Sequence, residues 1–63
     1  MTIRELLNTI ETTQSITVYR GKVSAETWLR TIEGTQKLDC SGKYWDEEVK
    51  EVIGYDHGLK AVI

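Results

Sequence analysis

The fold of this chain is decided at its C-terminal end, where Val49-Lys50-Glu51-Val52-Ile53-Gly54-Tyr55 is followed by Asp56-His57-Gly58 and then by Leu59-Lys60-Ala61-Val62-Ile63. Two apolar, β-prone runs on either side of a short turn signal predict a β-hairpin. The second run stops at the last residue without a polar tail, which is typical of a terminus held in a sheet. We therefore expect residues 1–63 to form one complete small domain.

Alternation along the hairpin separates its side chains into two faces. We expect Val52 and Val62 on one face beside Lys50 and Lys60, where so short a chain offers no obvious cover. Val52 and Val62 are therefore the candidate self-association residues. Gly58 is expected to take the positive φ of a tight turn. The opposite, core-facing set is expected to contain Val49, Ile53, Tyr55, Leu59, Ala61 and Ile63.

Length and composition narrow the fold further. A chain of 63 residues buries only about 60% of its unfolded surface, and a core of this size supplies roughly 3–5 kcal/mol. Cys40 is the lone cysteine, so the sequence predicts no internal disulfide, no metal site and no other cofactor. Formation of a homodimer is the remaining simple way to bury more surface.

The charge and hydropathy patterns bear on partners and compartment. The formal net charge of -2 is too small to attract a polyanion to the chain as a whole. No apolar run approaches the length of about 20 residues that spans a bilayer, and the N-terminal residues lack the pattern of a signal peptide. With a single cysteine, the cytoplasm is the expected compartment and no membrane partner is predicted.

The N-terminal third predicts a helix followed by a strand. Thr2 and Glu5 match the Thr-x-x-Glu capping box, and apolar residues follow at helical spacing, so we expect an amphipathic helix over residues 3–11. The β-branched and aromatic run 16–20 predicts a strand, which Gly21 closes.

Residues 25–33 fit two interpretations. Ser24 is a good N-cap, and the apolar residues that follow it, including Trp28, have helical spacing that would pack them on the sheet. The segment is also compatible with a strand. We favour a short helix, followed by a polar loop over residues 34–46. The predicted fold is thus α+β: a three- to four-stranded antiparallel sheet with a C-terminal hairpin, covered on one face by the N-terminal helix and this second helix.

Short motifs give the chain a resemblance to other small proteins. They are Met1-Thr2-Ile3-Arg4-Glu5-Leu6-Leu7, Ile16-Thr17-Val18-Tyr19, Gly21-Lys22-Val23, and Glu48-Val49-Lys50 before a terminal hairpin. In these motifs the chain resembles a loose group of small, largely uncharacterised α+β proteins from Gram-positive gut bacteria and their phages and mobile elements. The resemblance leaves out residues 24–46 and assigns no catalytic or binding residue. It implies an α+β fold and a mobile-element setting, and anti-CRISPR inhibitors carried by phages are similar in size and composition.

The candidate partner-binding site is Tyr44 and Trp45 followed by Asp46, Glu47 and Glu48. Loop aromatics are typical anchors at protein interfaces, and carboxylates suit a basic partner. The sequence therefore predicts a non-enzymatic protein–protein interaction module, such as an anti-CRISPR-like inhibitor acting on a host protein. The carboxylates also fit a solvated charged edge that resists aggregation, and their spacing is not that of a calcium-binding loop.

Binding of single-stranded nucleic acid is the alternative function. Basic side chains beside aromatic ones suit phosphates and stacked bases. The cations are scattered and the net charge is negative, so nucleic acid is the less favoured partner. The residues concerned are Arg20, Lys22, Lys37 and Lys43 with Tyr19, Tyr44 and Trp45.

Cys40 and His57 are the only thiol and imidazole. Asp39 directly precedes Cys40, and Asp56 directly precedes His57. A nucleophilic pair needs the two side chains within hydrogen-bond reach and a third, orienting group. No family signature surrounds the cysteine, so we expect a semi-buried Cys40, an exposed turn residue at His57 and no enzymatic activity.

Overall fold

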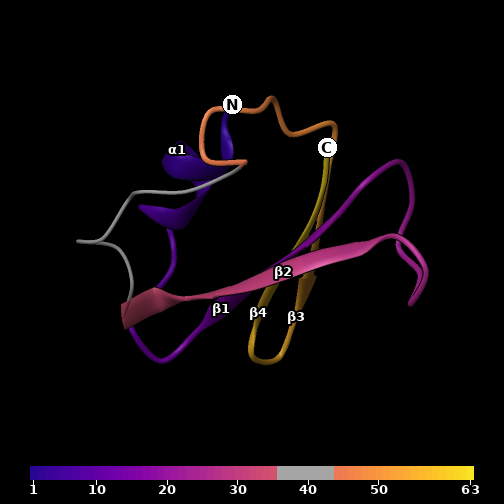
Figure 1. Ribbon diagram of the computed structural model, residues 1–63. Coiled ribbons are helices and arrows are strands. Elements are labelled where there is room, and N and C mark those ends of the chain that lie inside the picture. Colours follow the sequence, from indigo (N-terminus) through magenta and orange to yellow (C-terminus); the bar gives the residue numbers. More distant parts are fainter. Residues whose placement is uncertain (36–43) are drawn as a thin grey trace.

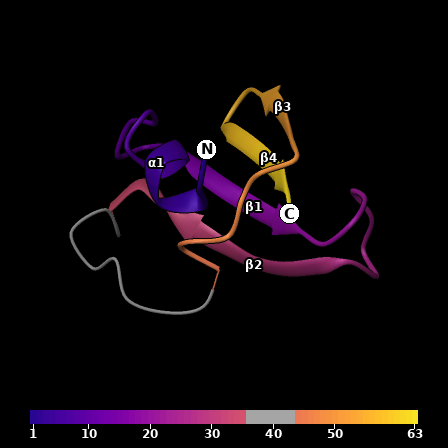
Figure 2. The ribbon, with the colours of Figure 1, turned by 90° about the horizontal axis from the view of Figure 1, so that it is seen from above.

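The computed structural model describes residues 1–35 and 44–63. These residues form one short helix and four strands: α1 (Ile3–Leu7), β1 (Ser15–Tyr19), β2 (Trp28–Glu33), β3 (Glu51–Tyr55) and β4 (Gly58–Val62). The strands make a single sheet in the order β2-β1-β4-β3, which Figure 2 shows side by side. The small α+β fold and the C-terminal hairpin of β3 and β4 are confirmed.

The sheet is mixed, so the prediction of a purely antiparallel sheet is wrong at its centre. β1 pairs antiparallel with β2 but parallel with β4. Parallel neighbours need a long connection. Here the chain between β1 and β4 includes β2, the segment 44–50 and β3 (Figure 1). The N-terminal and C-terminal halves therefore meet between β1 and β4, and β2 and β3 become the two edges.

The helix predicted over residues 25–33 is wrong, and the rival interpretation as a strand describes the structure. Ser24 does accept a hydrogen bond at Oγ from the backbone N–H of Thr27, at 3.3 Å, but this closes a single turn. The chain then enters β2, where Ile32 lies opposite Ile16 of β1. Because β-branched side chains pack well across paired strands, sheet pairing outweighs the helical spacing of this segment.

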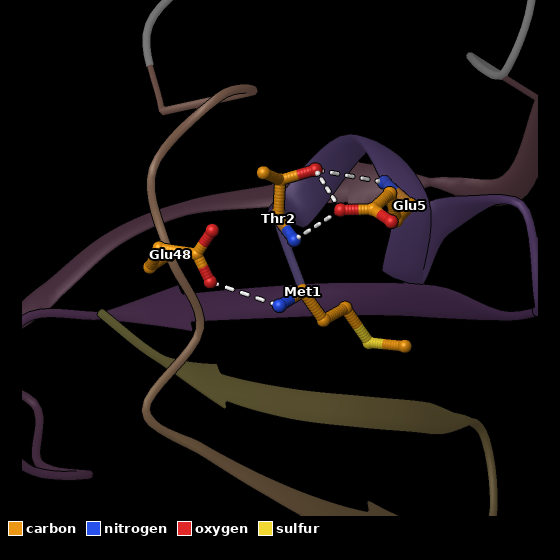
Figure 3. Close-up of polar contacts among 4 residues, drawn as sticks. All are labelled: Met1, Thr2, Glu5 and Glu48. Atoms are coloured by element: carbon orange, nitrogen blue, oxygen red, sulfur yellow. Dashed lines mark hydrogen bonds and ion pairs between the residues drawn. The ribbon is translucent and has the colours of Figure 1, made fainter.

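Helix α1 begins where the sequence predicts and ends earlier. The Thr2 Oγ1 atom accepts the Glu5 backbone N–H at 3.2 Å, and Glu5 Oε1 accepts the Thr2 N–H at 2.9 Å, which completes the capping box (Figure 3). The helix ends at Leu7, with Asn8 as its C-cap, rather than near residue 11. So short a helix is not stable alone in water, and its buried side has to be stabilised by tertiary packing.

One hydrophobic core joins α1, the segment 44–50 and one face of the sheet. Trp45 is among its fully buried side chains, with 1% of its surface exposed. The last residue, Ile63, is also buried, and its backbone N–H donates to the Tyr19 carbonyl at 2.9 Å. The buried members are Ile3, Leu6, Leu7, Ile10, Ile16, Val18, Ile32, Trp45, Ala61 and Ile63.

The register of the hairpin separates Val52 from Val62. Val52 lies opposite Ala61, and Glu51 lies opposite Val62. Directly opposed residues of antiparallel strands share a face, so Val52 is on the face of Ala61 and Val62 is on the other face. The prediction that both valines share one face is wrong because the two-residue turn, Asp56–His57, sets a different register across the hairpin.

Candidate functional site

Trp45, the predicted partner anchor, is a core residue. Its carbonyl accepts the Arg4 backbone N–H at 2.8 Å, and the Arg4 guanidinium lies 5.9 Å from the centre of its ring. The preceding residue, Tyr44, is half-buried and has a φ of 75°, a left-handed conformation that costs about 1–2 kcal/mol in a residue with a side chain. Because the indole is buried in the core, it is not exposed to a partner.

The predicted acidic contacts are ion-paired within the chain. Each of the three carboxylates lies beside a cation from the first 20 residues, so the acidic run helps to hold the N-terminal segment. Exposed pairs of this kind are screened by water and contribute little to stability, so they orient the segment more than they stabilise it. The pairs are Arg4–Asp46 at 3.1 Å, Arg20–Glu47 at 3.1 Å, and the Met1 amine with Glu48 at 2.8 Å.

Backbone contacts reinforce the join between the N-terminus and the segment 44–50. Thr2 and Glu48 form an isolated antiparallel bridge, and the Val49 N–H donates to the Met1 carbonyl at 2.8 Å. The hydrogen bond and charge of Glu48 raise the pKa of the Met1 amine above its usual 8.0. Hydrogen bonds from the backbone and side chain of Thr2 lower the pKa of Glu5 below its usual 4.5.

The predicted nucleic-acid residues are only partly brought together. The Arg20 guanidinium lies 6.0 Å from the centre of the Tyr44 ring and is already paired with Glu47. Lys22 is exposed in the turn region that follows β1. Lys37 and Lys43 lie outside the described residues.

The described residues do not test whether Cys40 and His57 lie close together, a pairing that the sequence does not favour. His57 is exposed in the hairpin turn, and its carbonyl accepts the Ser15 N–H at 3.0 Å. Cys40 and Asp39 lie outside the described residues, and Asp56 is exposed beside His57.

A set of side chains that the sequence analysis did not group lies on the face of the sheet opposite the core. The strand registers place twelve residues there in three rows, and we call this surface the aromatic face. Its rows, read from β2 to β3, are Trp28–Tyr19–Val62–Glu51, Thr31–Thr17–Lys60–Ile53 and Glu33–Ser15–Gly58–Tyr55.

Large exposed side chains are concentrated on the aromatic face. Trp28, Ile53 and Tyr55 are 51%, 39% and 37% exposed, and they come from the two edge strands. Trp28 Nε1 donates to Thr31 Oγ1 at 3.3 Å. The Lys60 ammonium lies 5.7 Å from the centre of the Tyr55 ring. Neighbouring side chains thus hold Trp28 and Tyr55, as expected for aromatic residues that contact a partner.

Charges on the aromatic face lie mainly at its corners. Glu33 and Glu51 are exposed at diagonally opposite positions of the three rows, and Lys60 lies between them in the middle row. Asp56 adds a carboxylate next to Tyr55. The surface therefore has exposed apolar side chains on its two edge strands, carboxylates at two corners and the Lys60 ammonium between them.

Sequence reasoning missed this surface first because it assigned Ile53 and Tyr55 to the core-facing set. That assignment is wrong, because the hairpin register places both residues on the face opposite the core, where they are exposed.

The position of Trp28 was missed for a local reason. Alternation along β2 alone places Trp28 and Ile32 on the same face, because their numbers differ by four. A register shift opposite Val18 and Tyr19 places Trp28 opposite Tyr19 instead, on the aromatic face. No signal in the sequence marks this irregularity.

The described residues, 1–35 and 44–63, contain no pocket and no group of three or more potential metal ligands. None of their helices is long and apolar enough to cross a membrane. Comparison with protein-family models, curated proteins and solved structures finds no match to the chain.

Proposed function

We propose that this protein is a non-enzymatic protein–protein interaction module whose aromatic face binds a host protein. The observation that carries the proposal is the grouping of Trp28, Ile53 and Tyr55, which are large, exposed and on the same face of one sheet. Tryptophan and tyrosine are the residues most enriched among energetic hot spots of protein interfaces. Their area lies on a rigid sheet, which lowers the entropy cost of binding.

The partner surface is expected to offer apolar contacts to the two edge strands and basic groups to the carboxylates beside β3. Glu51 and Asp56 are exposed at the margin of the aromatic face, and the chain as a whole has a net charge of -2. Complementary charge at an interface accelerates association and rejects wrong partners more than it adds affinity. Basic groups next to apolar ones on the partner therefore match the β3 side of this surface.

The segment 44–48 has a secondary role in the proposal. Tyr44 and Trp45 support this segment from inside, while Asp46 and Glu48 keep 82% and 73% of their side-chain surface exposed despite their ion pairs. These two carboxylates can contact basic groups of the same partner. The resemblance of the N-terminal helix, first strand and hairpin to proteins of phages and mobile elements supports a cytoplasmic accessory or inhibitor role.

Affinity capture from a lysate of the host, with surface variants as probes, tests the proposal. The double variant Trp28→Ala with Tyr55→Ala removes two exposed rings of the aromatic face. The double variant Asp46→Asn with Glu48→Gln alters the acidic segment only. We expect the first to weaken the captured partner's affinity by at least about 30-fold, since hot-spot truncations cost about 2 kcal/mol or more. The second should weaken it only a few-fold.

Circular dichroism of each variant provides the control for folding. Equal capture by the wild-type protein and the Trp28/Tyr55 variant would contradict the proposal.

The same variants should be titrated with a labelled single-stranded oligonucleotide at low salt. Saturable binding that requires Trp28 and Tyr55 and weakens steeply with salt would assign the aromatic face to nucleic acid instead.

A further inference from the structure

β3 is an edge strand with an unusually accessible side. It has β4 as its single neighbour in the sheet, and all five of its residues are exposed. Val52, Ile53 and Tyr55 are 43%, 39% and 37% exposed. An edge strand presents unpaired backbone N–H and C=O groups, which are a ready template for pairing with another strand.

The two edges of the sheet differ in the features that normally prevent such pairing. The opposite edge, β2, has a register shift in its pairing with β1 and carries Arg30 and Glu33. β3 pairs with β4 without a register shift, contains no proline or lysine, and has Glu51 as its one charged residue. Charged residues, prolines and bulges are the usual protection of an edge, and β3 has little of it.

We propose that β3 pairs antiparallel with β3 of a second copy of this chain, around a two-fold axis at Ile53. This register places Ile53 opposite Ile53 of the second copy and Val52 opposite Gly54. It also places Lys50 opposite Asp56 of the second copy, and the symmetry repeats this pair on the other side. Glu51 lies opposite Tyr55 of the second copy. The strand is thus complementary to itself in the aliphatic contacts at its centre and in the charges at its two ends.

Neighbouring registers lack this complementarity. A two-fold axis perpendicular to the sheet keeps faces matched only if the strand shifts by two residues at a time. Moving the axis to Val52 puts Ile53 opposite Glu51 of the second copy. Moving it to Gly54 puts Val52 opposite Asp56. Each shift places an aliphatic side chain against a carboxylate and separates Lys50 from Asp56, so the axis at Ile53 is favoured.

The dimer forms one continuous eight-stranded sheet from two four-stranded sheets. The pairing gives hydrogen-bond partners to backbone N–H and C=O groups of β3 that are otherwise bonded to water. It also buries part of Val52 and Ile53. A chain of 63 residues gains from such burial because its own core is small. The pairing also aligns the two aromatic faces side by side. Ile53 and Asp56 take part in this pairing and also in the proposed host contact, but the pairing is tested by the oligomeric state and the host contact by capture, so the two can fail separately.

Sedimentation equilibrium of the wild-type protein and of charge-reversal variants tests the register. Lys50→Asp puts two carboxylates opposite each other at both ends of the pairing, and Asp56→Lys puts two ammonium groups there. We expect each single variant to raise the dimer dissociation constant about tenfold, because attraction becomes repulsion at two symmetry-related positions. The double variant Lys50→Asp with Asp56→Lys should restore the wild-type constant to within about threefold, because the opposite charges are exchanged.

Lys22→Asp and Glu26→Lys are the matched controls, since both residues are exposed and lie outside β3. They make the same charge changes and should leave the dissociation constant within about twofold of the wild type. A wild-type chain that stays monomeric up to about 1 mM, the limit of biologically meaningful affinity, would overturn the proposal. A dimer that is insensitive to both single reversals would overturn it as well.

A cross-linking measurement tests the position of the axis separately. In a Cys40→Ser background, Ile53→Cys places two thiols opposite each other at the axis, within the reach of a disulfide. We expect a covalent dimer under mild oxidation. The control Thr31→Cys, on the β2 edge, should remain monomeric. Equal cross-linking of the two variants would contradict pairing through β3. Partner capture is measured in other experiments, so failure of this proposal leaves the proposed function separately testable.

Discussion

The two tryptophans show how the environment of a single residue decides its role. Trp28 and Trp45 have the same side chain, yet Trp28 is 51% exposed and Trp45 is 1% exposed. Trp28 lies on an edge strand at an irregular pairing, where its ring faces away from the core. Trp45 comes directly after Tyr44, which has a left-handed backbone, and the Trp45 ring is buried in the core. The residue suited to an interface is therefore Trp28, and the residue suited to folding is Trp45.

Titration at the N-terminus gives a prediction at the same scale. The pKa of Glu5 is lowered in the folded chain, so its ionised form contributes stability above about pH 4.5 that is lost as pH falls through the folded pKa. The pKa of the Met1 amine is raised, so its charged form contributes stability below about pH 8.0 that is lost as pH rises through the folded pKa.

Urea unfolding across pH, with two single variants, measures both effects. Glu5→Gln should flatten the acid side of the stability profile and change the alkaline side only slightly, because the Glu5 charge is the smallest of the effects that shift the pKa of the Met1 amine. Glu48→Gln should flatten the alkaline side, because it removes the partner of the Met1 amine. Each variant serves as the control for the other. A change on the same side of the profile in both would contradict the assignment.

At the scale of elements, the hairpin depends on a close approach at its second strand. Gly58 has a φ of 150°, which confirms the predicted positive φ, and it begins β4 directly beside Ser15 of β1. A Cβ atom at this position would lie 1.9 Å from the Ser15 carbonyl oxygen. Gly58 thus has a second role besides the turn, because the absence of a side chain there allows β4 to pair in parallel with β1.

Substitution of the two hairpin glycines separates this close approach from general strand propensity. Gly58→Ala should destabilise the fold by about 3 kcal/mol or more, since it combines a strained φ with a backbone clash. Gly54→Ala is the matched control: its Cβ would meet only Leu59 Cδ2, at 4.0 Å, so it should be neutral or stabilising by up to about 1 kcal/mol. Thermal and urea unfolding measure both. Equal losses in the two variants would contradict the close-approach explanation.

At the scale of the whole molecule, the segment 44–50 joins the two ends of the fold. The segment runs beside the N-terminus (Figure 1). It contributes Trp45 to the core and is joined to the N-terminus by ion pairs and backbone hydrogen bonds. The Ile3 and Arg4 N–H groups at the start of α1 donate to carbonyls of this segment, so the packing of the helix and the position of the segment depend on each other.

Truncation of the two tryptophans tests this organisation. Trp45→Ala should cost about 3–5 kcal/mol, which is comparable to the whole stability expected of so small a core, and the chain should be largely unfolded at 25 °C. Trp45→Phe should cost less, because the indole Nε1 has no hydrogen-bond partner within the described residues. Trp28→Ala, the control, should lie within about 0.5–1 kcal/mol of the wild type. Circular dichroism during urea unfolding measures all three, and a folded Trp45→Ala chain would contradict the assignment of Trp45 to the core.

Short-range interactions explain the local features that the sequence predicts correctly. The capping box of Thr2 and Glu5, the strand that Gly21 closes and the hairpin turn before Gly58 all depend on short-range hydrogen bonds and backbone conformation, which are encoded within a few residues.

The remaining features depend on pairing and packing between segments that are far apart in the chain. Three features are of this kind: the parallel pairing of β1 with β4, the strand structure of residues 28–33 and the burial of Trp45. The aromatic face arises in the same way, because a register shift in one pairing and the register of the hairpin place Trp28 and Tyr55 on one side of the sheet. Periodicity assigns side chains to a face only within one strand, whereas the relation between strands is set by hydrogen bonds across the sheet.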